Sequence, residues 1–188
     1  LAYNPKDLFH TNSLEVLDGR IAHSIPAFKE GNILLSMCHL DMIAVVDPAR
    51  RRVVWSMSGA FALQHDPTIT DDGGLMLFDN IWQQDKSRII VLAPASRDVI
   101  WQYSGTDEAP FYSQTCGTAK RLPNGNTLIS ESDNGRAFEV TMDGDIVWEF
   151  YNPHRAGDKG QYIATLFEMI RLQPGFPIEW ASDSPPAH

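Results

Sequence analysis

Short apolar runs separated by turn residues recur at a nearly fixed interval along this chain. Trp55, Trp101 and Trp148 lie 46 and 47 residues apart, and each directly follows two β-branched residues. Upstream of each tryptophan, a glycine turn opens another apolar run, over residues 31–35, 73–77 and 125–129. Asn-Gly and Asp-Gly pairs adopt positive φ readily and so favour tight hairpins between antiparallel strands. The pattern therefore predicts a repeated unit of short antiparallel strands.

Each unit has a third strand between its glycine turn and its tryptophan, over residues 43–47, 88–92 and 137–141. A second turn follows this strand, and one further strand leads from each tryptophan into the next unit. Four short strands in about 40 to 50 residues are typical of a propeller blade. No window shows sustained helical periodicity with caps, and the one weak helix candidate, residues 163–170, is also expected to be strand.

The predicted fold is an all-β propeller of four-stranded antiparallel blades, with three full units in residues 20–150 and partial blades at both ends. A closed propeller needs at least about four blades, so residues 1–181 are expected to form an incomplete ring. Residues 182–188 are expected to be a disordered tail. Unpaired strand edges invite pairing with other chains. We therefore expect either a piece of a longer protein or a chain whose open edges are covered by a protein partner or by self-association.

Composition narrows the classes of partner. A chain of 188 residues with 43% hydrophobic content can bury a core, and its net charge of −9 with a pI near 5.0 argues against a nucleic-acid partner. The basic run Arg50-Arg51-Arg52 is expected to be a solvated hairpin tip. The longest apolar stretches are about six residues, whereas a membrane span needs roughly 20.

Neither the cysteines nor the acidic turns predict a metal site. Cys38 and Cys116 form no CxxC pair, and the sequence leaves a disulfide between them open. The runs Asp71-Asp72-Gly73 and Asp143-Gly144-Asp145 raise the alternative of a calcium- or quinone-binding propeller. Both lie at predicted hairpin turns, where Asp-Gly is favoured by the backbone, and neither has the ligand spacing of an EF-hand. We expect no metal and no cofactor.

Two histidines occupy similar places in neighbouring units. His10 and His65 each stand at the entrance to a predicted inner strand and are flanked by polar residues. Propellers place ligand sites around the central channel, so the two imidazoles could converge on one channel mouth and share an anionic ligand. His23, His39 and His154 are expected to be surface or packing residues.

Several short motifs together resemble one family. They are His10-Thr11-Asn12-Ser13, Gln64-His65-Asp66, Phe78-Asp79-Asn80, Ser87-Arg88, Phe111-Tyr112-Ser113 and Leu122-Pro123-Asn124-Gly125-Asn126. In this combination the chain resembles the bacterial arylsulfotransferases from residue 7 to about residue 170. The resemblance implies a six-bladed propeller that moves a sulfuryl group from an aryl sulfate to a phenol without a nucleotide donor, in the periplasm or outside the cell.

The resemblance also implies roles for particular residues. The family uses a central histidine as nucleophile, with two further histidines and an arginine on the sulfuryl oxygens, and His10 and His65 match the oxygen-binding pair. The nucleophile is expected near residues 134–138, where Arg136 stands, and the nearest arginine after Phe78-Asp79-Asn80 is Arg88. An arginine binds sulfate bidentately but forms no covalent intermediate.

The candidate site therefore has two parts. His10, His65 and Arg88 are the catalytic candidates, and substrate contacts are assigned to Asn12, Phe111, Tyr112, Ser113 and Arg136. Phe111 and Tyr112 either stack on an aryl ring or belong to the core. Two functions stay open: an arylsulfotransferase-like enzyme with an aryl sulfate and a phenol as substrates, and a non-catalytic propeller that binds an anionic ligand or acts as a subunit.

Overall fold

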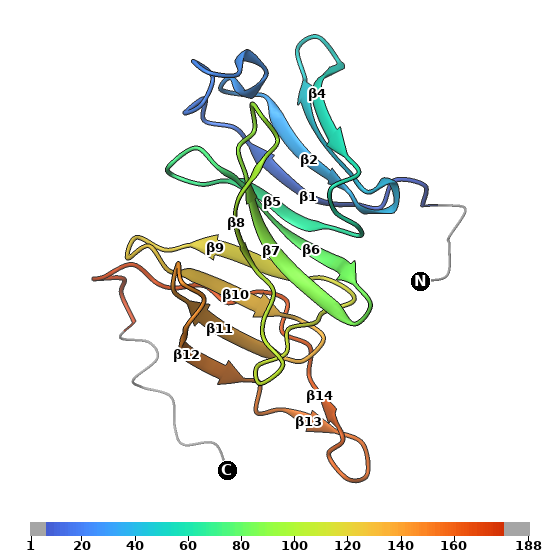
Figure 1. Cartoon of the computed structure of the whole chain (residues 1–188), viewed down its shortest axis with the longest axis vertical. Coiled ribbons are helices and arrows are strands. Elements are labelled where there is room, and N and C mark those ends of the chain that lie inside the picture. Colours follow the sequence, from blue (N-terminus) through green and yellow to red (C-terminus); the bar gives the residue numbers. More distant parts are fainter. Residues whose placement is uncertain (1–6, 179–188) are drawn as a thin grey trace.

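The computed structural model describes residues 7–178 and contains three four-stranded antiparallel sheets (Figure 1). Blade 1 consists of β1 (Thr11–Val16), β2 (Ile33–Met37), β3 (Met42–Asp47) and β4 (Arg52–Ser58). Blade 2 consists of β5 (His65–Ile69), β6 (Leu75–Gln83), β7 (Lys86–Leu92) and β8 (Val99–Tyr103). Blade 3 consists of β9 (Thr118–Arg121), β10 (Thr127–Glu131), β11 (Arg136–Val140) and β12 (Ile146–Tyr151). The predicted all-β blade architecture is confirmed, with β1 completing the first blade.

The remaining elements are short. Two 3₁₀ turns, η1 (Pro26–Phe28) and η2 (Cys38–Leu40), belong to blade 1. After blade 3 the chain forms a small two-stranded sheet from β13 (Arg155–Ala156) and β14 (Tyr162–Ile163). Among the described residues no helix is long and apolar enough to cross a membrane.

The three tryptophans occupy the same register in their blades. Trp55 pairs with Val45, Trp101 with Val91 and Trp148 with Glu139, and a register shift follows each of these pairs at the same place in the ladder. A bulge adds one residue to one strand and increases its twist. The 46- and 47-residue spacing seen in the sequence is therefore the repeat of the blade itself.

Blade 2 is buried on both faces, which explains the nearly continuous apolar runs of β6 and β7. Leu75, Leu77 and Ile90 point into the core between blades 1 and 2. Met76, Phe78 and Ile89, their neighbours in sequence, point into the core between blades 2 and 3. Because side chains alternate along a strand, one strand supplies both cores.

The outer faces of the end blades are open. Leu14 and Val16 of β1 are more than 60% exposed, whereas the intervening Glu15 reaches toward blade 2 and accepts a hydrogen bond from Ile69 N. Figure 1 shows the sheets side by side in chain order, without closure into a ring. The described residues thus form an open arc of a propeller.

The segment after β14 lies against blade 3. Leu166 N donates to Ser132 O, Met169 N donates to Ser130 Oγ, and Arg171 pairs with Glu139. Only Tyr162–Ile163 of this region is strand, so the predicted strand over 163–170 is wrong beyond its first residue. The physical reason is that no neighbouring strand of the described chain supplies a continuous ladder there. The predicted tail, 182–188, lies outside the described residues.

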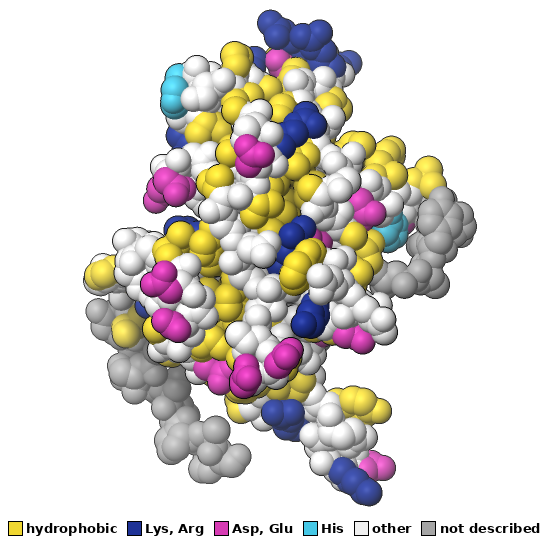
Figure 2. All heavy atoms as spheres, in the orientation of Figure 1, with side chains coloured by type: hydrophobic (Ala, Val, Ile, Leu, Met, Phe, Trp, Pro, Cys, Tyr) yellow, Lys and Arg dark blue, Asp and Glu magenta, His cyan; other side chains and the backbone are white. Residues whose placement is uncertain are grey.

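The basic run forms the predicted hairpin tip. Arg50 and Arg51 form the turn between β3 and β4, with Arg50 N bonded to Asp47 Oδ1. On the face shown in Figure 2, acidic and basic side chains are otherwise interspersed and form no extended basic field. That face therefore lacks the clustered cations that bind phosphate backbones.

Candidate functional site

Three histidines from blades 1 and 2 line one cavity of about 110 Å³, which we call the histidine pocket. Its lining residues are His10, Cys38, His39, Leu63, His65, Gln114, Thr115 and Cys116. The structure thus brings together the two histidines predicted from the sequence. His39, predicted to be a surface or packing residue, joins them.

The blade repeat explains how these residues meet. His10 directly precedes β1 and His65 opens β5, so both stand at the same end of adjacent inner strands. His39 lies in η2, in the connection between β2 and β3 that reaches the same end of blade 1. Leu63 N donates a hydrogen bond to Asp41 Oδ1 at 2.7 Å, which fixes the backbone just before His65.

His65 is the most enclosed of the three and has a defined hydrogen-bond pattern. Its Nδ1 lies 3.0 Å from Leu63 O and 2.9 Å from Asn80 Oδ1. Both partners are oxygen acceptors, so Nδ1 carries the proton and Nε2 keeps its lone pair. Burial lowers the pKa of His65 below its ordinary value, although the hydrogen bonds with Asn80 and Leu63 act in the opposite direction. The ring is therefore neutral at pH 7.

The orientation of Asn80 is fixed by two main-chain carbonyls. Its Nδ2 donates to Ser113 O at 2.9 Å and to Cys116 O at 2.6 Å, which leaves Oδ1 for His65. Asn80 is fully buried. The Phe78-Asp79-Asn80 motif thus contributes a core side chain, an ion pair and the residue that sets the tautomer of His65.

His10 and His39 form the outer part of the pocket. Their rings stack with centroids 4.6 Å apart and planes 20° apart. Nδ1 of His10 donates to Asp7 Oδ2 at 2.6 Å, and Nδ1 of His39 donates to Asp7 O at 2.9 Å. The hydrogen bond from His10 is the main reason that the pKa of Asp7 lies below its ordinary value.

The Nε2 atoms of all three histidines remain available. Within residues 7–178, no hydrogen bond to Nε2 of His10, His39 or His65 is present. Donor atoms of Asp7, His10 and His39 lie within 4.8 Å of one another, close enough to suggest a metal site. Nδ1 of both rings is already used in a hydrogen bond with Asp7, so Nε2 is the free ring nitrogen of each.

A second cavity, of about 190 Å³, adjoins the first at His65 and Cys116, and we call it the inner pocket. Its other lining residues are Asn12, Ser13, Asp66, Gly117, Thr118 and Phe167. Gly117 has φ of 116°, and a Cβ there would lie 2.5 Å from the ring of Phe78. Only glycine therefore allows this wall to approach the core so closely.

Asn12, predicted from the sequence to contact substrate, lines the inner pocket. Its Nδ2 donates to Gln64 O at 2.9 Å, and its buried Oδ1 has no hydrogen-bond partner among residues 7–178. Such an unpaired buried acceptor costs about 1–3 kcal/mol unless a ligand or water satisfies it.

Arg88 does not line either pocket. Its Nε donates to Asp79 Oδ2 at 2.8 Å and its Nη2 donates to Ala60 O at 2.8 Å. The guanidinium also lies 5.1 Å from the centroid of the Trp82 ring. The positive charge is already neutralised by a buried carboxylate, so Arg88 holds blade 2 together.

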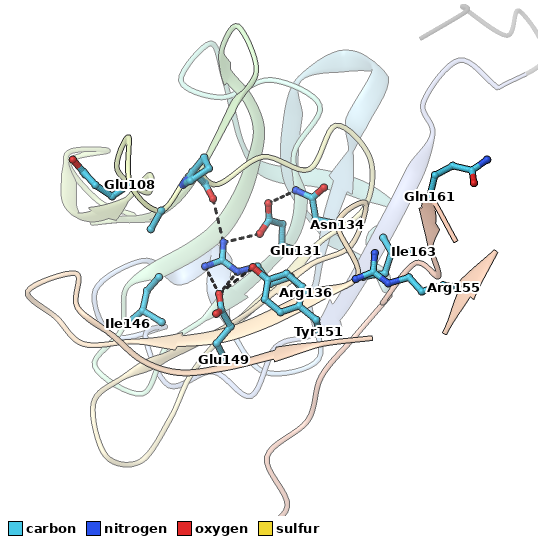
Figure 3. A pocket seen from close by; sticks show the side chains of 12 residues that line it. Glu108, Glu131, Asn134, Arg136, Ile146, Glu149, Tyr151, Arg155, Gln161 and Ile163 are labelled. Carbon is cyan, nitrogen blue, oxygen red and sulfur yellow. Dashed lines mark hydrogen bonds and ion pairs between the residues drawn. The ribbon is translucent and has the colours of Figure 1, made fainter. Parts of the chain in front are cut away.

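Arg136 occupies the equivalent register in blade 3 and is likewise held in ion pairs. Glu131 pairs with Arg136 across β10 and β11, just as Asp79 pairs with Arg88 across β6 and β7. Figure 3 shows the Arg136 guanidinium between Glu131 and Glu149, with distances of 3.1 Å and 2.6 Å. It borders a separate cavity of about 690 Å³ at the outer edge of blade 3. Two carboxylates leave it no net charge for a sulfate.

The Phe111-Tyr112-Ser113 motif supports the site rather than lining it. Phe111 is 2% exposed and packs edge-on against Phe78 and Phe138, so it is a core residue and cannot stack on a substrate. Ser113 is buried, and its Oγ donates to Thr115 O at 2.7 Å. Tyr112 is half-buried and lines neither pocket. These residues shape the loop that carries Gln114, Thr115 and Cys116.

The cysteines are unpaired in this structure. Cys38 and Cys116 both line the histidine pocket, and neither forms a disulfide. Burial raises the pKa of the Cys38 thiol to about 11, so it is a neutral apolar wall at physiological pH.

Fold and site together define an open propeller arc with three histidines around one pocket at the same end of blades 1 and 2. A family model described as Arylsulfotransferase (ASST) matches residues 2–153, and the chain belongs to this family. A search of curated proteins gives no match.

Solved structures place the fold among propellers. They include virginiamycin B lyase from Staphylococcus aureus, with a TM-score of 0.50 and 18% identity over 82% of this chain and 45% of that chain. The WD40 propeller domain of Doa1 has a TM-score of 0.52 and 16% identity, over 76% of this chain and 41% of that chain. The Dos1 propeller has a TM-score of 0.52 and 11% identity, over 81% of this chain and 38% of that chain. At these identities the likeness shows the fold alone, and this chain spans less than half the length of each.

Proposed function

We propose that this chain carries the sulfuryl-transfer site of a nucleotide-independent arylsulfotransferase, which moves a sulfuryl group from an aryl sulfate to a phenol. The observation that carries the proposal is the state of His65. It is half-buried and neutral, its Nδ1 is bonded to Asn80 and Leu63, and its Nε2 is free in a pocket with two further imidazoles.

His65 is the residue best placed to act as nucleophile. A neutral imidazole with a fixed Nδ1 proton offers one lone pair, at Nε2. Attack by Nε2 on the sulfur of an aryl sulfate forms the N–S bond while the S–O bond to the aryl group breaks. The developing positive charge on the ring is met by Leu63 O and Asn80 Oδ1. The role assigned from sequence to a residue near Arg136 thus passes to His65.

His10 and His39 line the pocket beside His65 and are placed to contact the transferring group. A sulfuryl group spreads negative charge over its oxygens, so fixed donors beside them stabilise the transition state. Nδ1 of His10 is bonded to the Asp7 carboxylate at 2.6 Å, which fixes the ring and leaves its Nε2 toward the pocket. His39 stacks on His10 and presents its Nε2 nearby. Neither Arg88 nor Arg136 is needed in this scheme.

Steady-state turnover tests the proposal. The protein is supplied with 4-nitrophenyl sulfate and phenol, and release of 4-nitrophenol is followed beside His65→Ala, His10→Ala and His23→Ala. His23 is exposed and lines neither pocket, so it is the matched control. We expect His65→Ala to lose turnover and His10→Ala to fall by about 10²-fold, in line with loss of one oxyanion donor. Full turnover by His65→Ala would contradict the proposal. No turnover by a well-folded parent would favour the alternative of an anion-binding propeller without catalysis.

The family likeness also supports a periplasmic or extracellular location. Fractionation of cells that express the native gene product tests this point directly.

A further inference from the structure

Asp66 directly follows His65, yet both side chains line the inner pocket. Successive side chains in a regular strand point to opposite faces. The ladder between β5 and β6 shifts register between His65 and Thr68, and Asp66 has φ of 50° within that shift. A bulge re-aims a side chain in this way and is common beside active sites. The local backbone therefore turns the Asp66 side chain toward the same pocket that His65 lines.

Asp66 is half-buried, and its carboxyl group has no cationic partner among the described residues. It accepts one hydrogen bond, from Ala119 N to Oδ2 at 3.2 Å, and no ion pair to it is present within residues 7–178. Burial raises the pKa of Asp66 to about 6. The charged groups that act on it are Glu15 of β1, Glu168 of the segment after β14, and Lys120 of β9; the two acids raise its pKa and the lysine lowers it.

The inner pocket has the size and lining for one aromatic ring. Its volume of about 190 Å³ exceeds the roughly 150 Å³ of an engineered cavity that binds benzene. Phe167 supplies an aromatic wall, and the buried oxygens of Asn12 and Ser13 have no hydrogen-bond partner among the described residues. A phenol in this pocket could place its hydroxyl between Asp66 and His65.

We propose that Asp66 is the general base that takes the proton from the phenolic acceptor. This inference rests on the proposed function. In the second half-reaction the phenol oxygen attacks the sulfur held on His65 Nε2. The new S–O bond forms as the S–N bond breaks, the bonding pair returns to Nε2, and the phenolic proton passes to the Asp66 carboxylate and then to water. In reverse, protonated Asp66 donates to a poor phenolate leaving group.

Asp66→Asn separates the two half-reactions. Release of 4-nitrophenolate needs no proton because it is a good leaving group, so the burst on mixing with 4-nitrophenyl sulfate is expected to be unchanged. Turnover with phenol is expected to fall by about 10²-fold, within the range for loss of a general base. Pentafluorophenol, which ionises readily, is expected to recover most of that loss.

Glu168→Gln is the matched control, since it also removes a negative charge that acts on Asp66. It should keep turnover with phenol and lower the pH at which the second half-reaction reaches half its maximum, which we expect near pH 6 in the parent. A burst in the parent together with undiminished phenol turnover in Asp66→Asn would overturn this inference alone. Absence of any burst in the parent would instead overturn the proposed function. If Asp66→Asn does not fold, a parent profile without a transition between about pH 5 and 7 overturns the inference as well.

Discussion

Asn80 Oδ1 lies 2.9 Å from Nδ1 of His65, and this contact joins blade 2's second strand to its first at the mouth of the pocket. The amide is held in that orientation by Ser113 O and Cys116 O, which come from the connection to blade 3. Packing between blades 2 and 3 thus fixes the tautomer of His65, which lines a pocket shared with blade 1. The reactivity of His65 therefore depends on the arc of blades as well as on its own strand.

The first prediction follows from this contact. Asn80→Ala removes an acceptor for His65 and the donor to Cys116 O, whereas Ser113 O keeps its hydrogen bond from Ser87 Oγ. We expect turnover to fall by about 10- to 100-fold and the free energy of unfolding to drop by about 2 kcal/mol, the usual cost of buried unpaired groups. Kinetics and urea denaturation measure the two effects. Asn152→Ala is the control, because its bond to Ala164 O is exposed and both quantities should change little.

The second prediction concerns Arg88. Arg88→Met leaves Asp79 buried without its partner, and breaking a buried pair in this way costs about 3–5 kcal/mol. We expect a clear loss of stability in urea but an unchanged burst per folded molecule, because Arg88 contacts neither pocket. The double variant Asp79→Asn with Arg88→Met should regain most of the stability. A folded Arg88→Met protein that cannot form the burst would return Arg88 to the catalytic set.

The third prediction concerns the pH dependence of stability. The pKa of Asp66 is about 6 in the folded protein and 3.8 as its ordinary value, so the folded state binds more protons between these values. Stability contributed by protonated Asp66 is therefore present below about pH 4 and is lost as the pH rises through 6. Replacement by asparagine keeps the acceptor for Ala119 N and removes the buried charge. We expect Asp66→Asn to raise the free energy of unfolding at pH 7 by about 1–3 kcal/mol and to leave it nearly unchanged at pH 4.

Thermal and urea unfolding of parent and Asp66→Asn at both pH values measure this difference. A lower stability of Asp66→Asn at pH 7 would show that the carboxylate is a structural group. Removal of an active-site group often stabilises a protein, because such groups are kept for activity at a cost in stability.

The fourth prediction uses the two thiols. Cys38 is 2% exposed and its pKa of about 11 keeps it protonated, whereas Cys116 is only half-buried. Because the thiolate is the reactive species, iodoacetamide at pH 8 should leave Cys38 unmodified in the folded protein and label it once the protein is unfolded. Peptide mass mapping distinguishes the two sites. Rapid labelling of Cys38 in the folded protein would contradict this account of the pocket wall.

The fold could be predicted from the sequence because its signals are local and repeated. Each tryptophan with its two β-branched neighbours marks the outer strand, and the glycine turns mark the hairpins, so a single period predicts every blade. The segment 163–170 could not be predicted in this way. Its apolar residues are typical of a strand, but a strand also needs a neighbour to complete its ladder.

The site was less predictable because its contacts cross between strands and blades. Arg88 and Arg136 were given a catalytic and a binding role because the sequence does not display their ion pairs directly. Their acidic partners, Asp79 and Glu131, stand nine and five residues earlier and meet them across a hairpin. The sequence does contain a sign of these ion pairs, since an acidic and a basic residue flank the same turn in two successive units. His39 was missed because no other unit has a histidine there, and Asn80 because its role depends on carbonyl groups that no sequence motif displays.

Direct mapping of the covalent intermediate tests the central claim. The protein is mixed with 4-nitrophenyl sulfate without an acceptor, quenched in alkali, digested and analysed by mass spectrometry, with His65→Ala beside it. We predict one sulfuryl group on the peptide that contains His65, discharged when phenol is added before the quench, and none in His65→Ala. Turnover that proceeds with the sulfuryl group on another residue, or with no modified peptide at all, would contradict the assignment of His65 as the nucleophile.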